Sequence, residues 1–221
     1  EVPGLGGVYT ITASANLTNC ASHGDWKSCP RCKDRGDGDI IAEVNAVIEE
    51  GVHRSAPDAK VMISDWGWRG HGDAPDIIAK LPKSVYLMSV SEWHLPIERG
   101  GVKSTVGEYS ISSVGPGPRS LAHWKVAMDL GLKTGTEIQF NNTCEIASIP
   151  YLPVLDLVAE HCNNLESQAS LDALFIGWTM GGHPSPNLLI PQRFGKKPTP
   201  SIDTVLDEIA KERFGEAGAP H

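Results

Sequence analysis

The sequence lacks the features that define several classes of protein. It has no run of about 18 uninterrupted apolar residues, which a bilayer-spanning helix would need, so no membrane partner is expected. The net charge is -8 and no long basic stretch occurs, which argues against nucleic acid as a partner. No charged-then-apolar leader follows Glu1, and although a leader could have been removed, a cytoplasmic location is slightly favoured. A neutral polar ligand fits this charge balance better.

Tyrosine and phenylalanine are also scarce, at four residues each, whereas six tryptophans are present. Several of the tryptophans stand beside Gly, Asp or Glu and not inside apolar runs. With 221 residues the chain is long enough to bury one sizeable core, and one α/β domain is the natural expectation.

Predicted strands alternate with predicted helices along the chain. Strands are expected at residues 8–13, 60–64, 85–90, 136–140 and 173–178, with a small extra strand at 109–112. Helices are expected from about Asp39, which is a candidate N-cap, then at 75–81, 119–130 and 152–165, and through Ile202, Val205, Leu206 and Ile209. This alternation predicts a parallel sheet, either doubly wound or closed into a barrel.

Two details favour a (β/α)8-type, or TIM, barrel. No G-x-G-x-x-G loop follows the first strand, as a nucleotide-binding sheet would often show. Polar and aromatic residues also collect just after almost every strand, where barrel enzymes place their sites. Only about five βα units are visible and a full barrel needs eight, so an incomplete barrel is expected, the later part of the fold. The predicted organisation is a partial barrel over residues 1–195, then a linker and an amphipathic helix over 196–221.

Carboxylates after strands are the candidate catalytic groups. Hydrolysis of a glycosidic bond generally needs a proton donor and a second group that attacks or stabilises the oxocarbenium-like centre. Asp65 ends one predicted strand and Glu92 the next, each followed by a tryptophan, and Glu145 follows the next strong strand by five residues. The alternative is that these acids cap helices or pair with Arg and Lys around the rim.

Aromatic, amide and imidazole side chains in the same positions are the candidate sugar-binding groups. Aromatic faces pack well on the apolar faces of sugar rings, and amides hydrogen-bond hydroxyl groups as both donor and acceptor. The candidates are Trp66, Trp93, Asn141, Asn142, Trp178 and His183. The asparagines could equally cap a turn, and a lone loop histidine is commonly only solvated.

Cys20, His23, Cys29 and Cys32 form a compact constellation with the spacing C-x2-H-x5-C-x2-C. Four such ligands in one polar loop match a tetrahedral zinc site, and with every position filled by protein the ion would be structural. A disulfide within the loop and free thiols in a turn are the competing interpretations. Cys144 and Cys162 are expected to be packed thiols. No organic cofactor is expected.

Several stretches are similar to those of a known family. S-D-W-G-W, S-V-S-E-W-H-L-P-I, G-E-Y-S-I-S-S-V-G-P-G-P-R, W-T-M-G-G-H-P-S-P-N-L, the C-x-x-C loop and the closing E-R-F-G-E-A resemble bacterial glycoside hydrolases with hexosaminidase-like barrels. The resemblance implies a retaining or inverting attack on a β-linked amino sugar or a related glycan. It also implies a general acid just after the fourth barrel strand, aligned here with residues 8–13, where Ala15 stands instead.

The expected function is therefore glycoside hydrolysis of a carbohydrate substrate through strand-end carboxylates. Three alternatives stay open: a catalytically silent glycan-binding barrel, a zinc-stabilised interaction module, and a barrel enzyme acting on a phosphorylated metabolite. The last would need a phosphate cradle near the final strands, where the glycine pair Gly181-Gly182 is followed by His-Pro and not by a basic residue. The sequence leaves the sugar, the anomeric outcome and the oligomeric state open.

Overall fold

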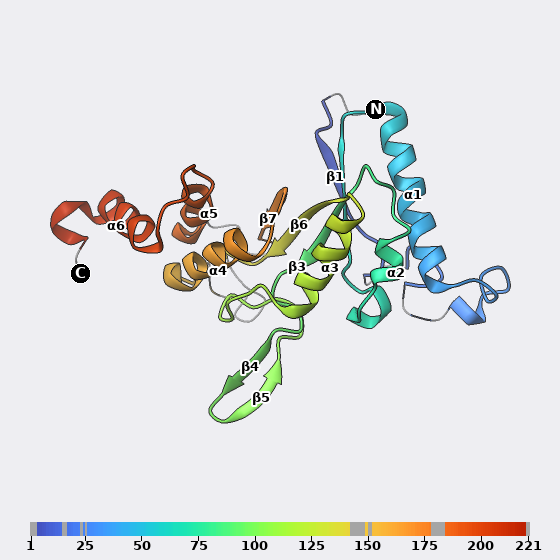
Figure 1. Cartoon of the computed structure of the whole chain (residues 1–221), viewed down its shortest axis with the longest axis horizontal. Coiled ribbons are helices and arrows are strands. Elements are labelled where there is room, and N and C mark those ends of the chain that lie inside the picture. Colours follow the sequence, from blue (N-terminus) through green and yellow to red (C-terminus); the bar gives the residue numbers. More distant parts are fainter. Residues whose placement is uncertain are drawn as a thin grey trace. The chain divides into compact units, whose positions relative to one another are not determined.

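The computed structural model describes residues 4–14, 17–22, 24, 26–141, 149, 152–177 and 184–219. It divides into two compact units, each formed from separate stretches of the chain. Unit 1 comprises Glu1–Val90, Leu121–Thr136 and Leu171–Ala173, and unit 2 comprises Ser91–Ser120, Glu137–Ser170 and Leu174–His221. Figure 1 shows the elements of both units.

Five strands form the main sheet, which confirms the predicted neighbours and their order. The strands are β1 (Gly7–Ile11), β2 (Lys60–Ser64), β3 (Tyr86–Val90), β6 (Lys133–Ile138) and β7 (Ala173–Ile176). They lie in the order β1-β2-β3-β6-β7, so the spatial order follows the chain. The β1–β2 and β2–β3 pairs are parallel, with Val8 opposite Val61 and Ile63 opposite Leu87.

The prediction of a (β/α)8-type barrel is wrong. The described strands form one open sheet of five strands and a separate sheet of two, and no closed barrel is present among them. Alternating strand and helix patterns are the same for open and closed parallel sheets. Closure depends in addition on the number, tilt and stagger of the strands, which hydrophobic periodicity does not record.

Helices follow the strands in both units, near the positions that the sequence predicts. They are α1 (Asp37–Ser55), α2 (Pro75–Ile78), α3 (Pro118–Asp129), α4 (Leu155–Gln168), α5 (Leu189–Phe194) and α6 (Ile202–Gly218). Three short 3₁₀ turns are η1 (Trp26–Ser28), η2 (Trp68–His71) and η4 (Pro186–Leu188). The predicted N-cap at Asp39 is wrong, because α1 is capped at Gly36 and takes both Asp37 and Asp39 into its first turn. Acids there interact favourably with the helix dipole.

The core of unit 1 lies between its strands and helices α1 and α2. Ile40 and Ile41 of α1 pack in one buried cluster with Val61 and Ile63 of β2 and Ile77 of α2. These side chains are at most 4% exposed. Fully burying an aliphatic side chain of this size contributes roughly 1.5–3 kcal/mol, so the cluster fixes the elements that carry the strand-end residues of unit 1.

Unit 2 contains a hairpin that the sequence does not predict. Strands β4 (Pro96–Arg99) and β5 (Val102–Thr105) pair antiparallel, and the predicted strand at 109–112 is wrong because those residues form no strand. Gly100 and Gly101 join the pair with φ of 57° and 80°. A two-residue turn with both φ positive matches the twist of a hairpin, and glycine adopts it at little cost.

The remaining helices of unit 2 pack on one another. Helix α4 contacts α5 and α6, and burial of Val158, Leu165, Val205 and Ile209 holds these helices together. Cys162 of α4 is a buried, free thiol, as expected for a packed cysteine, and burial raises its pKa to about 12. Within the part of the chain that the structure describes, no helix is long and apolar enough to span a membrane.

Candidate functional site

The loop after β1 carries the cysteines, and backbone hydrogen bonds define its path. The carbonyl of Thr12, just beyond β1, accepts hydrogen bonds from Ser22 Oγ at 2.9 Å and from Asn19 Nδ2 at 2.9 Å. Farther along, Cys29 N–H donates to the carbonyl of Trp26 at 3.0 Å, and Cys32 N–H donates to that of Cys29 at 3.2 Å. A polar loop without a core of its own is thus tied to the end of a core strand.

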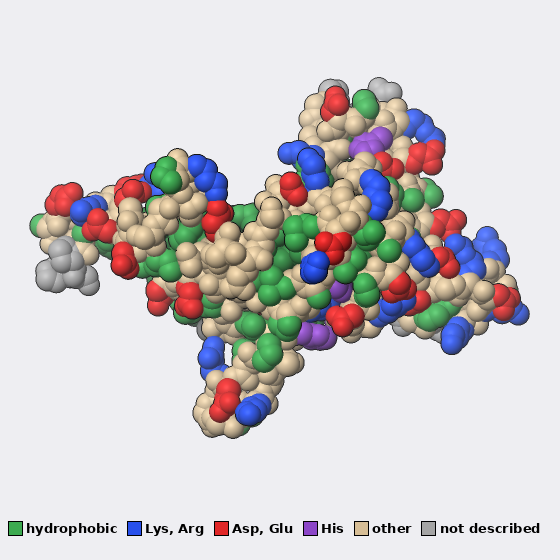
Figure 2. Space-filling model, in the orientation of Figure 1, with side chains coloured by type: hydrophobic (Ala, Val, Ile, Leu, Met, Phe, Trp, Pro, Cys, Tyr) green, Lys and Arg blue, Asp and Glu red, His purple; other side chains and the backbone are tan. Residues whose placement is uncertain are grey.

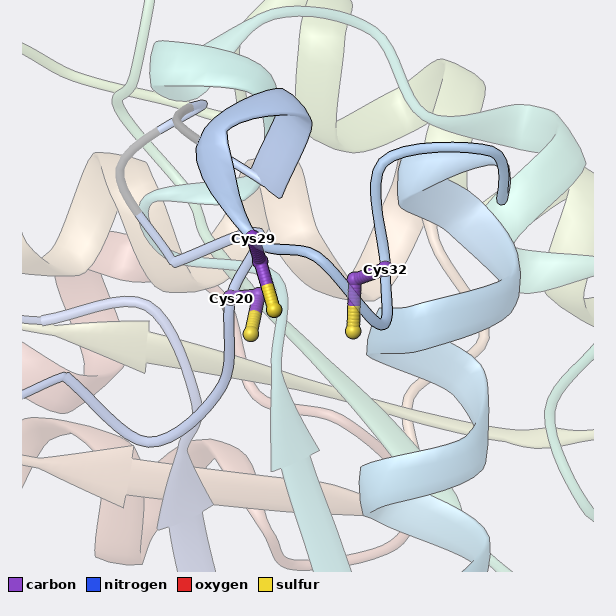
Figure 3. Close-up of side chains that lie close together, drawn as sticks. All are labelled: Cys20, Cys29 and Cys32. Carbon is purple, nitrogen blue, oxygen red and sulfur yellow. The ribbon is translucent and has the colours of Figure 1, made fainter.

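Cys20, Cys29 and Cys32 lie close enough to bind a metal ion. Their Sγ atoms all lie within 4.8 Å of one another, and none of the three is in a disulfide. Figure 3 shows the three sulfurs on the same side of the loop. Tetrahedral zinc with Zn–S bonds of about 2.3 Å would separate its sulfurs by roughly 3.8 Å, so only a small closure would be needed. The donor set therefore fits a thiophilic metal.

The thiols of Cys29 and Cys20 differ in acidity because of the hydrogen bonds that they make. Backbone N–H groups, that of Arg31 first, together with the thiol of Cys20 lower the pKa of Cys29 to about 7. Hydrogen bonds to Cys29 and then Cys32 raise the pKa of Cys20 to about 11. The thiolate is the form that binds metal, so Cys29 is the ligand that is most readily available near neutral pH.

Basic side chains surround this loop. Residues 26–35 include Lys27, Arg31, Lys33 and Arg35, and Figure 2 shows Lys and Arg side chains gathered over this end of unit 1, at the right of the view. A divalent ion with three thiolates carries a net negative charge, which nearby cations favour. The surroundings are consistent with a metal-thiolate cluster.

Asp65, the first of the predicted catalytic acids, is held by two donors within unit 1. Its Oδ2 accepts a hydrogen bond from Ser89 Oγ at 2.6 Å and one from His123 Nδ1 at 2.7 Å. His123 Nε2 accepts the N–H of Ala74 at 3.1 Å, so a neutral imidazole carries its proton on Nδ1 and donates it to Asp65. Asp65 is 0% exposed and His123 1%. The arrangement fastens β2 to β3 and α3.

Glu92, the second predicted acid, lies in unit 2 beside His161 of α4. It is 1% exposed, and its Oε1 lies 3.8 Å from His161 Nδ1, too far for a direct hydrogen bond. His161 Nε2 is 2.7 Å from Ser91 Oγ. Burial lowers the pKa of His161 to about 3, so the imidazole is neutral at ordinary pH.

A second acid, which the sequence did not single out, is buried in unit 2. Glu137 near the end of β6 is 0% exposed and accepts a hydrogen bond from Tyr109 Oη at 2.7 Å. Ser91 N–H donates to the backbone carbonyl of Glu137 at 3.3 Å, so the segment that carries Glu92 runs beside the end of β6. Glu92 comes two residues after β3, and Glu137 lies in β6, the neighbouring strand of the sheet.

An arginine and a tryptophan complete the buried polar region of unit 2. Arg119 at the start of α3 is 3% exposed and its guanidinium lies over the ring of Trp93, 5.0 Å from the centroid. Trp93 is 0% exposed, so its ring packs inside the unit and is not presented as a stacking surface. Asn141 is half-buried, and its side-chain oxygen accepts the N–H of Ser185 at 2.8 Å, which joins two loops.

The predicted site residues are thus distributed over the molecule. Asp65 and Trp66 belong to unit 1, whereas Glu92, Trp93 and Asn141 belong to unit 2, so a single pocket that holds Asp65 and Glu92 stays a prediction. Ala15, His23, Asn142, Glu145, Trp178 and His183 lie outside the described residues.

The sequence offered weak signals for the residues that were missed. Glu137 is the acid in the apolar-flanked strand segment T-E-I-Q-F, and a charge inside such a segment is a reason to suspect a buried polar site. Tyr109 and Arg119 lie in a glycine- and serine-rich stretch, and His161 lies on the apolar face of a helix. No local pattern connects these three with Glu92.

Comparisons of the chain with family models, curated proteins and solved structures gave no match. The resemblance to hexosaminidase-like hydrolases therefore stays a prediction, and the assignment of function depends on the geometry of the described residues.

Proposed function

We propose that this protein hydrolyses a β-linked amino sugar or a related glycan, with Glu92 and Glu137 as its two catalytic carboxyl groups. The observation that carries the proposal is their location in unit 2: Glu92 comes two residues after β3, Glu137 lies in the neighbouring strand β6, and each is at most 1% exposed. Burial of a charged carboxylate costs free energy unless the group is paired or hydrogen-bonded. Buried titratable groups are concentrated at functional sites.

The neighbours of the two acids suit glycoside hydrolysis. One carboxyl group must donate a proton while a second attacks the sugar or activates water, and pairs of this kind work at separations of about 5 to 9.5 Å. The hydroxyl of Tyr109 donates to Glu137, which favours the ionised form of that carboxyl. Glu137 is therefore assigned as the nucleophile or base, and Glu92 as the proton donor. Asp65, which two donors hold in unit 1, is assigned a structural part.

One observation favours a second candidate function. Glu92, Glu137 and Trp93 are all at most 1% exposed, as purely structural groups would be. A glycan-binding protein without hydrolytic activity, one of the alternatives raised by the sequence, is therefore the competing proposal.

Turnover of an aryl β-glycoside of N-acetylglucosamine separates the two candidates. The wild-type protein should release the aryl group, and Glu92→Gln should lower kcat by about two orders of magnitude or more, because the amide keeps the shape but cannot supply the proton. Glu98→Gln, an exposed residue of β4, serves as the matched control. Absence of turnover by the wild-type protein across a panel of aryl β-glycosides, together with binding of the intact sugar, would favour the silent binding protein.

We further propose that the metal of the three-cysteine cluster is structural zinc. Three thiolates suit zinc, and His23, three residues after Cys20, would be the fourth ligand. The ion would tie together a loop that has no core of its own, and the protein should contain one zinc per chain. Elemental analysis of the purified protein and of Cys29→Ser tests this, since the variant should lose the metal.

A further inference from the structure

A pocket of about 530 Å³ lies in unit 1, between the cysteine loop and the turn that follows β2. This volume is within the usual range for small-molecule sites. Trp26 from η1, and Trp66 and His71 from the turn, are among the residues that line it. We call this the tryptophan pocket. No part of the mechanism proposed for unit 2 uses it.

The turn that supplies Trp66 has an unusual backbone. Arg69 and His71 have φ of 50° and 77°, in the left-handed region that residues other than glycine rarely adopt. Gly67, with φ of 79°, approaches the segment after β1 so closely that a Cβ there would lie 2.2 Å from the carbonyl oxygen of Ala13. Gly67 N–H donates to His71 Nδ1 at 3.1 Å and closes the turn. Strain of this kind persists where the surroundings impose it, and it clusters at ligand sites.

The charges around the tryptophan pocket favour a neutral ligand. Its arginine, Arg69, is bound by Asp37 at 2.8 Å and by Asp76 at 2.5 Å. Two carboxylates therefore already neutralise the guanidinium, which leaves it poorly suited to bind a phosphate or another anion. Lys27 of the cysteine loop lies over the Trp26 ring, with its Nζ 5.6 Å from the centroid, so the indole already contacts this cation. Indole faces with a few polar groups are instead suited to the C–H-rich face of a sugar ring.

The cysteine cluster and the tryptophan pocket share a wall. Trp26 lies between Cys20 and Cys29 in the chain, and its carbonyl accepts the N–H of Cys29 at 3.0 Å. Its indole N–H donates to the carbonyl of Arg35 at 2.9 Å, and the N–H of Arg35 donates to that of Cys32 at 2.9 Å. Hydrogen bonds thus connect Trp26 to both ends of the Cys29–Cys32 segment, through its backbone to Cys29 and through its indole and Arg35 to Cys32.

We propose that the tryptophan pocket, which Trp66 and Trp26 line, binds the ring of a neutral glycan, and that a metal ion on the three cysteines holds the wall that Trp26 forms. The ligand class rests on the glycan function proposed above, but the site does not depend on hydrolysis in unit 2. The metal acts on binding through the position of a side chain and makes no contact with the sugar.

Isothermal titration calorimetry tests the pocket. The zinc-loaded protein is titrated with the β-linked trimer of N-acetylglucosamine. The wild-type protein should bind the trimer, and Trp66→Ala and Trp26→Ala should each weaken binding by about tenfold or more. Trp66→Phe should keep most of the affinity. Phe214→Ala, an exposed aromatic of α6 in unit 2, is the matched control and should bind as the wild type does. No saturable binding at millimolar trimer, or wild-type affinity in folded Trp66→Ala, would overturn the pocket.

The part played by the metal has its own readout. Removal of zinc should weaken binding of the trimer by about tenfold, and by thermodynamic reciprocity the trimer should raise the affinity for zinc by the same factor. The affinity for zinc, measured with and without the trimer, stays informative even if the metal-free protein loses its fold. Equal zinc affinity with and without the trimer would contradict the coupling. Glu92→Gln should abolish turnover and leave binding of the trimer intact, so failure of hydrolysis and failure of the pocket give different results.

Discussion

Units 1 and 2 both place acids at the ends of parallel strands, but they surround them differently. In unit 1, Asp65 accepts hydrogen bonds from a serine of β3 and a histidine of α3, at 2.6 and 2.7 Å. In unit 2, Glu92 lies 3.8 Å from a neutral histidine, and a second buried acid, Glu137, accepts a hydrogen bond from a tyrosine. An acid that follows a strand is therefore not a catalyst by position alone. The groups that contact the acid determine whether its role is structural or catalytic.

The largest effect on stability should come from breaking the Asp65 network. His123→Ala removes the Nδ1 donor from a buried carboxylate and the Nε2 acceptor from the N–H of Ala74. Removing one partner of a buried pair costs about 3–5 kcal/mol, and urea unfolding should show a loss of that order. Lys125→Ala removes an exposed ion pair with Asp129 on the same helix and should cost less than about 0.5 kcal/mol. Comparable losses in the two variants would mean that the network is not what stabilises unit 1.

A smaller loss is expected from the strained turn of unit 1. Gly67→Ala places a Cβ where the carbonyl oxygen of Ala13 lies and imposes a side chain on a left-handed backbone. We expect a destabilisation of at least about 2 kcal/mol. Gly70→Ala has a similar φ of 60° but open space around the Cβ, so it isolates the backbone cost and should be milder. Equal effects in thermal unfolding would show that the close approach to the segment after β1 is unimportant.

The two units should also respond oppositely to pH through one histidine each. In unit 2, burial lowers the pKa of His161 to about 3, from an ordinary value of 6.5. The unfolded chain then binds a proton that the folded chain does not. Stability should accordingly fall as the pH drops from 6.5 toward 3, by up to about 1.4 kcal/mol per pH unit.

In unit 1, hydrogen bonding to the carbonyl of Ala59 and then to Glu49 raises the pKa of His53. The stabilisation from His53 is therefore present at low pH and lost as the pH rises through the raised pKa. Histidine titrations by NMR, together with unfolding of His161→Gln and His53→Gln as a function of pH, would separate the two effects. Titration of His161 near 6.5 would contradict its burial.

The sequence predicted more of the fold than of the site. Strand order follows from the alternation of β-rich and amphipathic segments, and the five strands lie in the predicted order. The hairpin β4–β5 was missed because P-I-E-R and V-K-S-T have little apolar content, and its stability comes from the Gly100-Gly101 turn. The assignment of these strands to an incomplete (β/α)8-type barrel was wrong, since barrel formation depends on geometry that local patterns do not encode.

At the candidate sites, the spacing of residues close together in the chain predicted the cysteine cluster. Contacts between residues far apart in the chain could not be predicted from the sequence. Cys20, Cys29 and Cys32 lie within 13 residues, and the structure brings their sulfurs together. Glu92 and Glu137 are far apart in the chain, and only the pairing of β3 with β6 brings their segments side by side. His123, which holds Asp65, could not be assigned to it from spacing, because their contact spans 58 positions.

Steady-state kinetics of three variants, measured under the same conditions, test the contrast between the two units most directly. The variants are Glu92→Gln, Glu137→Gln and Asp65→Asn. With an aryl β-glycoside of N-acetylglucosamine, we predict that each glutamate variant loses about two orders of magnitude in kcat or more, while it keeps the wild-type urea midpoint within a small margin. Asp65→Asn should instead lose stability and, at temperatures where it stays folded, keep most of its turnover. A folded Asp65→Asn that is inactive, beside glutamate variants that turn over at the wild-type rate, would contradict the assignment of the chemistry to unit 2.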